Sequence, residues 1–258
     1  MGTKVLKPEQ RLIVAADFKQ NYLTVTKEGP IEWVRGEVLK LADSLQGTGV
    51  ILKVNDALRA CGYGLIREIH DRGLSVFADL KLNDIPDTLE RDGDLLRDMA
   101  PELLTVMCSS GTPSLVALKK VLPNVEILGV TVLTSLKEDE SAKIHGITPI
   151  ASAARILAEI ASNAGMDGLI MAPSEIEWIK LRIRPEMTIN TPAIRPTWAI
   201  VKGDDQNPDR IMTPAKAIAA GATRIVVGRP IVTASCGPRE ATLRTLEEVA
   251  HATSALAA

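Results

Sequence analysis

The stretch from Phe77 to Thr88, FADLKLNDIPDT, concentrates ionisable groups that could do chemistry. It begins as an apolar strand and then places Asp79, Lys81 and Asp84 close together. Side chains two residues apart share one face of a strand, so we expect Asp79 and Lys81 to point the same way. Because removing either charge from water is costly without a compensating partner, the stretch is either a surface turn or an active site that pairs a carboxylate with an ammonium group.

The elements that would position these groups alternate along the chain. Short apolar runs predict strands over 12–16, 50–54, 74–79, 103–107, 126–133, 168–172, 187–191 and 223–227. Apolar residues at helical spacing predict helices over 31–45, 58–69 (ended by Gly73), 86–100, 113–121, 149–164, 174–183 (capped by Ser174), 213–221 and 238–257.

Eight alternating strands and helices indicate an α/β protein with a parallel sheet that closes into a single (β/α)8 TIM barrel. We expect one domain over residues 1–258, with residues 1–10 as a loosely ordered N-terminal extension. A doubly wound open sheet is the alternative architecture. It would usually carry a glycine fingerprint after the first strand, and the sequence AADFKQ has none.

Polar residues follow several of the predicted strands, at the end where active sites lie in such barrels. They are Asp17, Lys53, Asp79, Lys81, Thr134, Arg195 and Arg229. A single charge at a strand end is usually a solvated turn, but these residues would all converge on one mouth. The sequence therefore favours an active site at this end of the barrel.

A phosphate site is predicted where the last strands end. The segment VVGRP, Val226 to Pro230, follows the eighth strand, and loops at this place commonly bind phosphate. Gly228 would let the backbone approach the anion, while Arg229 could pair with two of its oxygens. The segment TPAIRP, Thr191 to Pro196, and the long loop 197–205 with Trp198 look like the facing half of the site, with the loop as a lid.

Composition narrows the class of protein. Lys plus Arg number 30 and Asp plus Glu 32, giving a formal charge of −2 that provides no argument for binding nucleic acid or a membrane. Three cysteines far apart suggest neither disulfides nor a zinc site, and no apolar run is long enough for a signal peptide or membrane span, so we expect a cytoplasmic protein. Cys108 has no base nearby and is interpreted as a packing residue.

Five segments resemble the orotidine 5'-phosphate decarboxylase family in order and approximate spacing. They are DLKLNDIPDT, VTVLTS (130–135), TPAIRP, DQNPDRIMTP (205–214) and VVGRP. The resemblance spans nearly the whole chain and implies decarboxylation of orotidine 5'-phosphate to uridine 5'-phosphate, the last step of UMP synthesis. It also implies that the enzyme needs no metal or organic cofactor and that it is a homodimer with shared active sites.

The resemblance further assigns roles to residues of this sequence. Lys53, Asp79, Lys81 and Asp84 would form the catalytic charge network, with Lys81 protonating the ring carbon after CO2 leaves from beside Asp79. Ile85 and Thr88, together with Asp84, would be presented to the neighbouring subunit's site. The other substrate-binding residues would be Asp17 at the ribose, Thr134 at the pyrimidine, Arg195, Gln206, Gly228 and Arg229 around the phosphate, and Pro192.

The sequence departs from the family pattern at a few positions and leaves two other functions open. Ala193 replaces an expected glycine, Cys108 replaces a common histidine, and the loop 197–205 is longer than usual. One alternative is a sister phosphosugar decarboxylase that uses a similar Asp-x-Lys-x-x-Asp strand with magnesium, although its pattern lacks the IPDT continuation. The other is a barrel that binds nucleotides without catalysis. The presence of both Asp79 and Lys81 argues against it.

Overall fold

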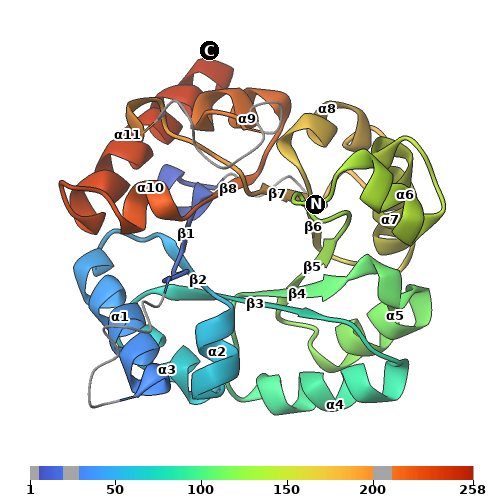
Figure 1. Ribbon diagram of the computed structural model, residues 1–258, viewed down its shortest axis with the longest axis horizontal. Coiled ribbons are helices and arrows are strands. Elements are labelled where there is room, and N and C mark those ends of the chain that lie inside the picture. The colour runs from blue at the N-terminus through green and yellow to red at the C-terminus, as the bar shows by residue number, and fades with distance from the viewer. Residues whose placement is uncertain (1–5, 20–28, 200–210, 258) are drawn as a thin grey trace.

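The computed structural model describes residues 6–19, 29–199 and 211–257, and within them eight parallel strands close into a barrel (Figure 1). The strands are β1 (Leu12–Ala15), β2 (Ile51–Val54), β3 (Ser75–Leu82), β4 (Leu103–Met107), β5 (Glu126–Val130), β6 (Gly168–Ile170), β7 (Thr188–Thr191) and β8 (Arg224–Val227). Their order around the barrel follows the sequence, and β8 pairs with β1 to close it. The predicted TIM barrel is thus confirmed.

Helices form a ring outside the strands (Figure 1). The α-helices are α1 (Pro30–Leu45), α2 (Asp56–Cys61), α3 (Gly64–His70), α4 (Pro86–Arg97), α5 (Thr112–Val121), α6 (Glu138–His145), α7 (Ile150–Asn163), α8 (Ile176–Ile179), α9 (Pro214–Ala220), α10 (Arg229–Val232) and α11 (Pro238–Ala257). Short 3-10 helices are η1 (Pro8–Arg11), η2 (Cys108–Ser110), η3 (Pro173–Glu175) and η4 (Thr197–Ala199). In the described part of the chain, none of the helices is long and apolar enough to cross a membrane.

Strand alternation separates two apolar cores. One set of strand residues packs in the barrel interior and includes Ile13, Ile51, Phe77, Leu103, Leu128 and Val226. The alternate strand residues pack outward against the helices in a larger core. Because every second residue points inward, the residue two positions after each interior residue lies nearer the mouth.

Some predicted elements differ from the structure. The helix expected through Leu58 and Ile69 is two helices, because Gly62 takes a φ of 80° at the end of α2. The helix predicted over 174–183 is also wrong in its bounds, since Ser174 lies inside η3 and α8 covers only Ile176–Ile179. Strand β5 ends at Val130 rather than at 133.

The N-terminal segment also corrects a prediction. Residues 6–10 were expected to belong to a loosely ordered extension, but Pro8–Arg11 forms η1 and Leu6 is buried with 6% of its surface exposed. The Arg11 side chain donates to the Thr223 carbonyl at 3.3 Å, which ties this segment to the start of β8. Residues 1–5 lie outside the described residues.

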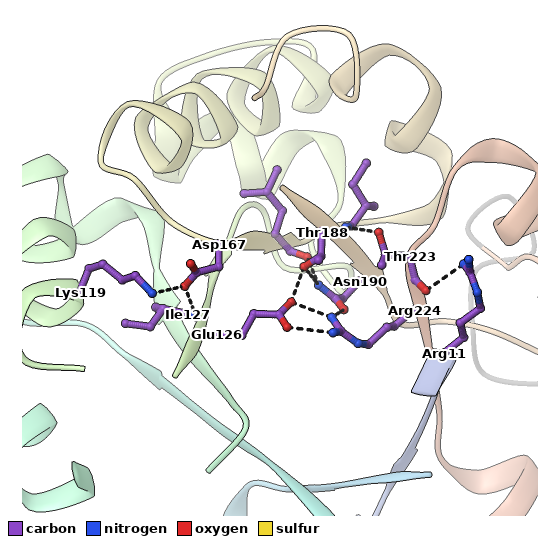
Figure 2. A network of polar contacts seen from close by, with 11 residues as sticks. Arg11, Lys119, Glu126, Ile127, Asp167, Thr188, Asn190, Thr223 and Arg224 are labelled. Carbon is purple, nitrogen blue, oxygen red and sulfur yellow. Dashed lines mark hydrogen bonds and ion pairs between the residues drawn. The ribbon is translucent and has the colours of Figure 1, made fainter. Parts of the chain in front are cut away.

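Figure 2 shows a network of polar contacts that includes Glu126, Thr188 and Arg224. These are the first residues of β5, β7 and β8, so this polar layer lies at the end of the barrel opposite the mouth. The Arg224 guanidinium donates to both carboxylate oxygens of Glu126, at 2.7 and 2.8 Å, and to the Asn190 side-chain oxygen at 3.1 Å. The Thr188 hydroxyl also donates to Glu126, at 2.6 Å. Arg224 and Asn190 are buried, so these bonds offset the cost of placing a charge and a dipole inside the barrel, although Arg224 Nε has no hydrogen-bond partner in the described part of the chain.

Candidate active site

Three adjacent strands place polar residues directly above the interior apolar layer. Lys53 follows Ile51 in β2 by two residues, Asp79 follows Phe77 in β3, and Thr105 follows Leu103 in β4. Strand alternation therefore turns all three toward the barrel interior at its mouth end. Each is buried, with 7%, 5% and 0% exposure respectively.

Four charged side chains form a continuous chain at this level. The Lys53 ammonium lies 3.1 Å from Asp17 Oδ1 and 3.2 Å from Asp79 Oδ2. The Lys81 ammonium lies 2.7 Å from the same Asp79 oxygen. The prediction that Asp79 and Lys81 share a face is confirmed by this contact, and the order of the charges is negative, positive, negative, positive.

Burial and charge pairing act in opposite directions on these groups. Burial alone would raise the pKa of Asp79, but the ammonium groups of Lys53 and Lys81, with hydrogen bonds from Lys81 and Thr105, hold the pKa below its ordinary value of 3.8. Burial alone would lower the pKa of Lys53, but Asp79 and Asp17 outweigh it and raise the pKa above 10.5. Both groups are therefore ionised at neutral pH, as expected for a buried set of balanced charge.

The backbone around Lys81 departs from a regular strand. Between Ala78 and Leu82, β3 advances four residues while β4 advances from Leu104 to Val106. Lys81 has a φ of 49°, in the left-handed region that L-residues other than glycine seldom adopt. Strand β3 consequently extends past Asp79, where the sequence predicted its end, to Leu82.

A cavity of about 620 Å³ opens at the mouth and gathers most of the predicted site residues. Those that line it are Asp17, Lys53, Asp79, Lys81, Thr134, Pro192, Arg195, Gly228 and Arg229. Apolar walls come from residues such as Phe77, Val130 and Ile170. A cavity with apolar walls and a few convergent polar groups is the usual form of a small-molecule site.

The arginines lie where β7 and β8 lead into their loops. Arg195 follows β7 and is 6% exposed, while Arg229 begins α10 directly after Gly228. A Cβ on Gly228 would come no closer than 3.5 Å to another heavy atom of the chain. The expected approach of this backbone to an anion stays a prediction. Ala193, which replaces an expected glycine, has a φ of 61° and therefore holds a conformation that favours glycine.

Asp84, Ile85 and Thr88 do not reach this cavity within one chain. Asp84 and Ile85 line a separate surface pocket beside Pro86 and Ser110, and Ile85 is 63% exposed. Asp84 accepts a hydrogen bond from the Ile85 backbone at 2.7 Å, and the Lys53–Asp79–Lys81 set is joined by Asp17 in its place. Thr88 lies in the first turns of α4. Gln206 and most of the 197–205 loop lie outside the described residues.

Sequence reasoning missed several residues of the site, among them Thr105, Arg59 and Phe18. Thr105 looked like an ordinary β-branched strand residue, although its spacing of two from Leu103 would have placed it inside the mouth. Arg59 lines the cavity and donates to the Leu80 carbonyl at 3.0 Å. Phe18 lines it as well and packs edge-to-face on Trp33 with ring centres 6.5 Å apart. No motif identified Arg59 or Phe18.

Cys108 is a core residue. It is fully buried, and burial raises the pKa of its thiol to about 12, so the interpretation as a packing residue is confirmed. A Cβ on Gly129 would come within 2.8 Å of the Cys108 sulfur, which shows how tightly this part of the core is packed. Among residues 6–19, 29–199 and 211–257, no group of three or more His, Cys, Asp or Glu side chains is arranged to hold a metal ion.

Comparisons with known proteins give consistent matches. The model of the orotidine 5'-phosphate decarboxylase / HUMPS family matches residues 10–245. A protein of Saccharophagus degradans named orotidine 5'-phosphate decarboxylase is 34% identical over 249 residues, covering 94% of each chain. One of Pseudomonas fluorescens with the same name is 36% identical over 223 residues, covering 84% of this chain and 93% of the relative. The crystal structure of orotidine 5'-phosphate decarboxylase from Lactobacillus acidophilus is similar, with a TM-score of 0.74, 27% identity, and coverage of 93% of this chain and 99% of that one.

Proposed function

The chain belongs to the orotidine 5'-phosphate decarboxylase / HUMPS family, and from that premise we propose how its barrel mouth decarboxylates orotidine 5'-phosphate in pyrimidine biosynthesis. The resemblance seen in the sequence motifs is confirmed by these matches. The observation that carries the residue-level proposal is the buried chain Asp17–Lys53–Asp79–Lys81 in the wall of the cavity.

Asp79 and Lys81 act on the reacting atoms. The substrate's carboxylate lies beside Asp79, where two negative charges repel, and this repulsion is relieved as CO2 leaves. The bond between the ring carbon and the carboxylate carbon breaks, and its electron pair remains on the ring carbon. The Lys81 ammonium stabilises this charge and donates a proton to the carbon, giving uridine 5'-phosphate, and solvent then reprotonates the amine. The protein thus supplies the acid from its own side chains.

Lys53 and Asp17 bring the net charge of the chain Asp17–Lys53–Asp79–Lys81 to zero. Two carboxylates and two ammonium groups sum to zero, so the site can stay ionised inside the barrel before substrate binds. The Asp17 side chain is 53% exposed and faces the cavity, which supports a contact with the ribose hydroxyls. Thr134 and Pro192 line the same space and are proposed to contact the nucleotide.

The phosphate is proposed to bind at the opposite side of the cavity. Arg195 and Arg229 bring two guanidinium groups to the loops after β7 and β8, and Gly228 supplies backbone beside them. Guanidinium groups bind phosphate oxygens in pairs, so the remote phosphate can anchor the substrate while the charge chain acts on its ring. Gln206, which lies outside the described residues, is proposed to join this site.

A homodimer would bring Asp84, Ile85 and Thr88 to a neighbouring active site. Support comes from the exposed Ile85 and the surface pocket that it shares with Asp84. Mixing inactive Asp79→Ala and Asp84→Ala proteins should restore part of the activity, because some mixed dimers carry one intact site. No recovery after demonstrated subunit exchange would contradict the shared site.

We also propose a cytoplasmic location. Support comes from Cys61, Cys108 and Cys236, which are free cysteines rather than members of disulfides.

The test of this function is the loss of orotidine 5'-phosphate absorbance with purified protein, with and without a chelator. We expect turnover that the chelator does not change. Turnover that disappears with chelator would favour the magnesium-dependent sister phosphosugar decarboxylase. Tight binding of uridine 5'-phosphate without turnover would instead indicate a nucleotide-binding barrel.

A further inference from the structure

The Thr105 hydroxyl connects the two residues proposed to act on the substrate. Its oxygen lies 2.9 Å from Asp79 Oδ1 and 2.9 Å from the backbone nitrogen of Lys81. Thr105 is fully buried on β4 and is absent from the residues that line the cavity. Thr105 can therefore influence the site only through its two hydrogen-bond partners, Asp79 and Lys81.

The direction of both hydrogen bonds follows from the chemistry of the groups. A backbone N–H can only donate, so Thr105 accepts from Lys81. The ionised Asp79 carboxylate can only accept, so the single hydroxyl proton of Thr105 points to it. The hydroxyl thus uses its donor and an acceptor lone pair in one fixed arrangement, which a methyl group in its place could not provide.

Each bond holds a feature on which the reaction depends. The Lys81 backbone has a φ of 49° inside the irregular part of β3, where the regular strand pairing with β4 is interrupted. The bond from its N–H to Thr105 replaces the missing ladder contact and fixes where the lysine side chain begins. The bond to Asp79 Oδ1 holds the carboxylate so that Oδ2 receives both Lys53, at 3.2 Å, and Lys81, at 2.7 Å.

We propose that Thr105 is a positioning residue for the decarboxylation, holding the Asp79 carboxylate and the Lys81 backbone in register so that the Lys81 ammonium meets the ring carbon. This inference rests on the proposed function. It assigns Thr105 no contact with substrate. It predicts that the hydroxyl, rather than the volume of the side chain, sets the rate.

Comparing Thr105→Ala with Thr105→Ser isolates the hydroxyl, since both variants lose the methyl group. We expect kcat of Thr105→Ala to be about ten- to a hundredfold below that of Thr105→Ser, the loss typical of a hydrogen bond to a charged group. KM should change little, because the phosphate and ribose contacts remain. Equal kcat in the two variants would overturn the proposal. If Thr105→Ala is recovered unfolded, Thr105→Val takes its place, because it keeps the volume.

The pH profile separates positioning from a general loss of structure. A hydrogen bond to the ionised carboxylate lowers the pKa of Asp79, so removing it raises that pKa. The activity of Thr105→Ala should therefore begin to fall at a higher pH on the acid side than that of Thr105→Ser. As a matched control, Thr245→Val removes another fully buried hydroxyl, bonded to the Ala241 carbonyl at 2.8 Å in α11, and should leave kcat unchanged.

A failure of the proposed function is distinguishable from a failure of this inference. Wild-type protein without turnover of orotidine 5'-phosphate would contradict the function. The Thr105 bond would then be tested by NMR titration of the Asp79 carboxyl carbon, which should titrate at a higher pH in Thr105→Ala than in Thr105→Ser. Identical titration in both variants would overturn the role of Thr105 whatever the activity.

Discussion

Replacing Lys53 by Met should destabilise the barrel strongly, because it leaves the buried Asp79 carboxylate without one of its two cations. The Lys53 and Asp79 side chains are each 8% exposed, so water replaces the lost ammonium group only weakly. Methionine keeps most of the aliphatic stem and fills similar space, so the loss is chiefly electrostatic. The substitution therefore tests whether the ion pairs of Asp17, Lys53, Asp79 and Lys81 are shielded from water strongly enough to contribute to the stability of the fold.

The magnitude follows from the remaining partners. Removing one member of a buried pair costs about 3–5 kcal/mol, and Lys81 still contacts Asp79 at 2.7 Å, so we expect the lower end, about 3 kcal/mol at pH 7. The contact of Lys53 with Asp17 adds little, since the Asp17 side chain is 53% exposed. Adding Asp79→Asn to Lys53→Met should recover about 1–2 kcal/mol, because the uncompensated charge is gone.

The sign of the pH dependence is fixed by the pKa shifts. The pKa of Asp79 is depressed in the folded protein, so the stability it contributes is present above its ordinary value of 3.8 and is lost as the pH falls through the folded pKa. The pKa of Lys53 is raised, so its contribution is present below 10.5 and is lost as the pH rises through the folded value. Losing Lys53 raises the pKa of Asp79. The difference between wild type and Lys53→Met should thus be largest near neutral pH and shrink as Asp79 is protonated.

Urea unfolding followed by circular dichroism, at one fixed protein concentration, measures these differences. The matched control is Lys40→Met, which removes a lysine that is 77% exposed and lies 2.7 Å from Glu37, and should cost less than about 0.5 kcal/mol. A loss below about 1 kcal/mol for Lys53→Met, or one that does not shrink between pH 7 and pH 3, would refute the reasoning. It would mean that water screens the charges at the mouth.

Four further predictions address single residues. Lys81→Ala should abolish turnover, because it removes the proposed proton donor, and a kcat close to wild type would exclude that role. Arg229→Ala should weaken binding of uridine 5'-phosphate by about ten- to a hundredfold in calorimetry, the loss of a charge-assisted hydrogen bond, and an unchanged affinity would remove Arg229 from the phosphate site. Ala193→Gly should raise stability by about 0.5–1 kcal/mol in urea, because glycine relieves the φ of 61°. A thiol reagent at pH 8 should label the exposed Cys236 in the native protein but Cys108 only after unfolding, and native labelling of Cys108 would contradict its burial and the pKa of about 12.

The barrel could be predicted because burial dictates its sequence pattern. Strands that are covered on both faces are continuous apolar runs such as 12–16. These runs alternate with segments whose apolar residues have helical spacing. The helix bounds that were predicted wrongly depended on the backbone dihedral angles of single residues. Gly62 ends α2 by adopting a φ of 80°, and a glycine inside a helical pattern does not reveal this choice. Ser174 looked like a helix cap, but the turn at Pro173–Glu175 is a 3-10 helix.

The site residues could be predicted where they lie two positions apart at the end of a strand, because side chains at this spacing share one face of the strand. Asp79 and Lys81 were placed side by side on that ground, and their side chains do meet. The irregularity of β3 and the role of the Thr105 hydroxyl could not be foreseen, because they arise from the register between β3 and β4 rather than from either strand alone. Asp84 could be assigned only by resemblance, since its proposed partner site belongs to another copy of the chain.

The polar layer at the base of the barrel has a consequence for the order in which the chain assembles. Glu126 lies on β5 and Arg224, 98 positions later in the sequence, lies on β8. Their paired hydrogen bonds (Figure 2) therefore form only when the last strand is in place. An intermediate that ends at β6 lacks the arginine that pairs with Glu126. Such half-barrels gain none of these hydrogen bonds and also keep open strand edges. Assembly of the C-terminal strands is thereby coupled to β5, which makes closure of the ring a cooperative step with a long sequence separation.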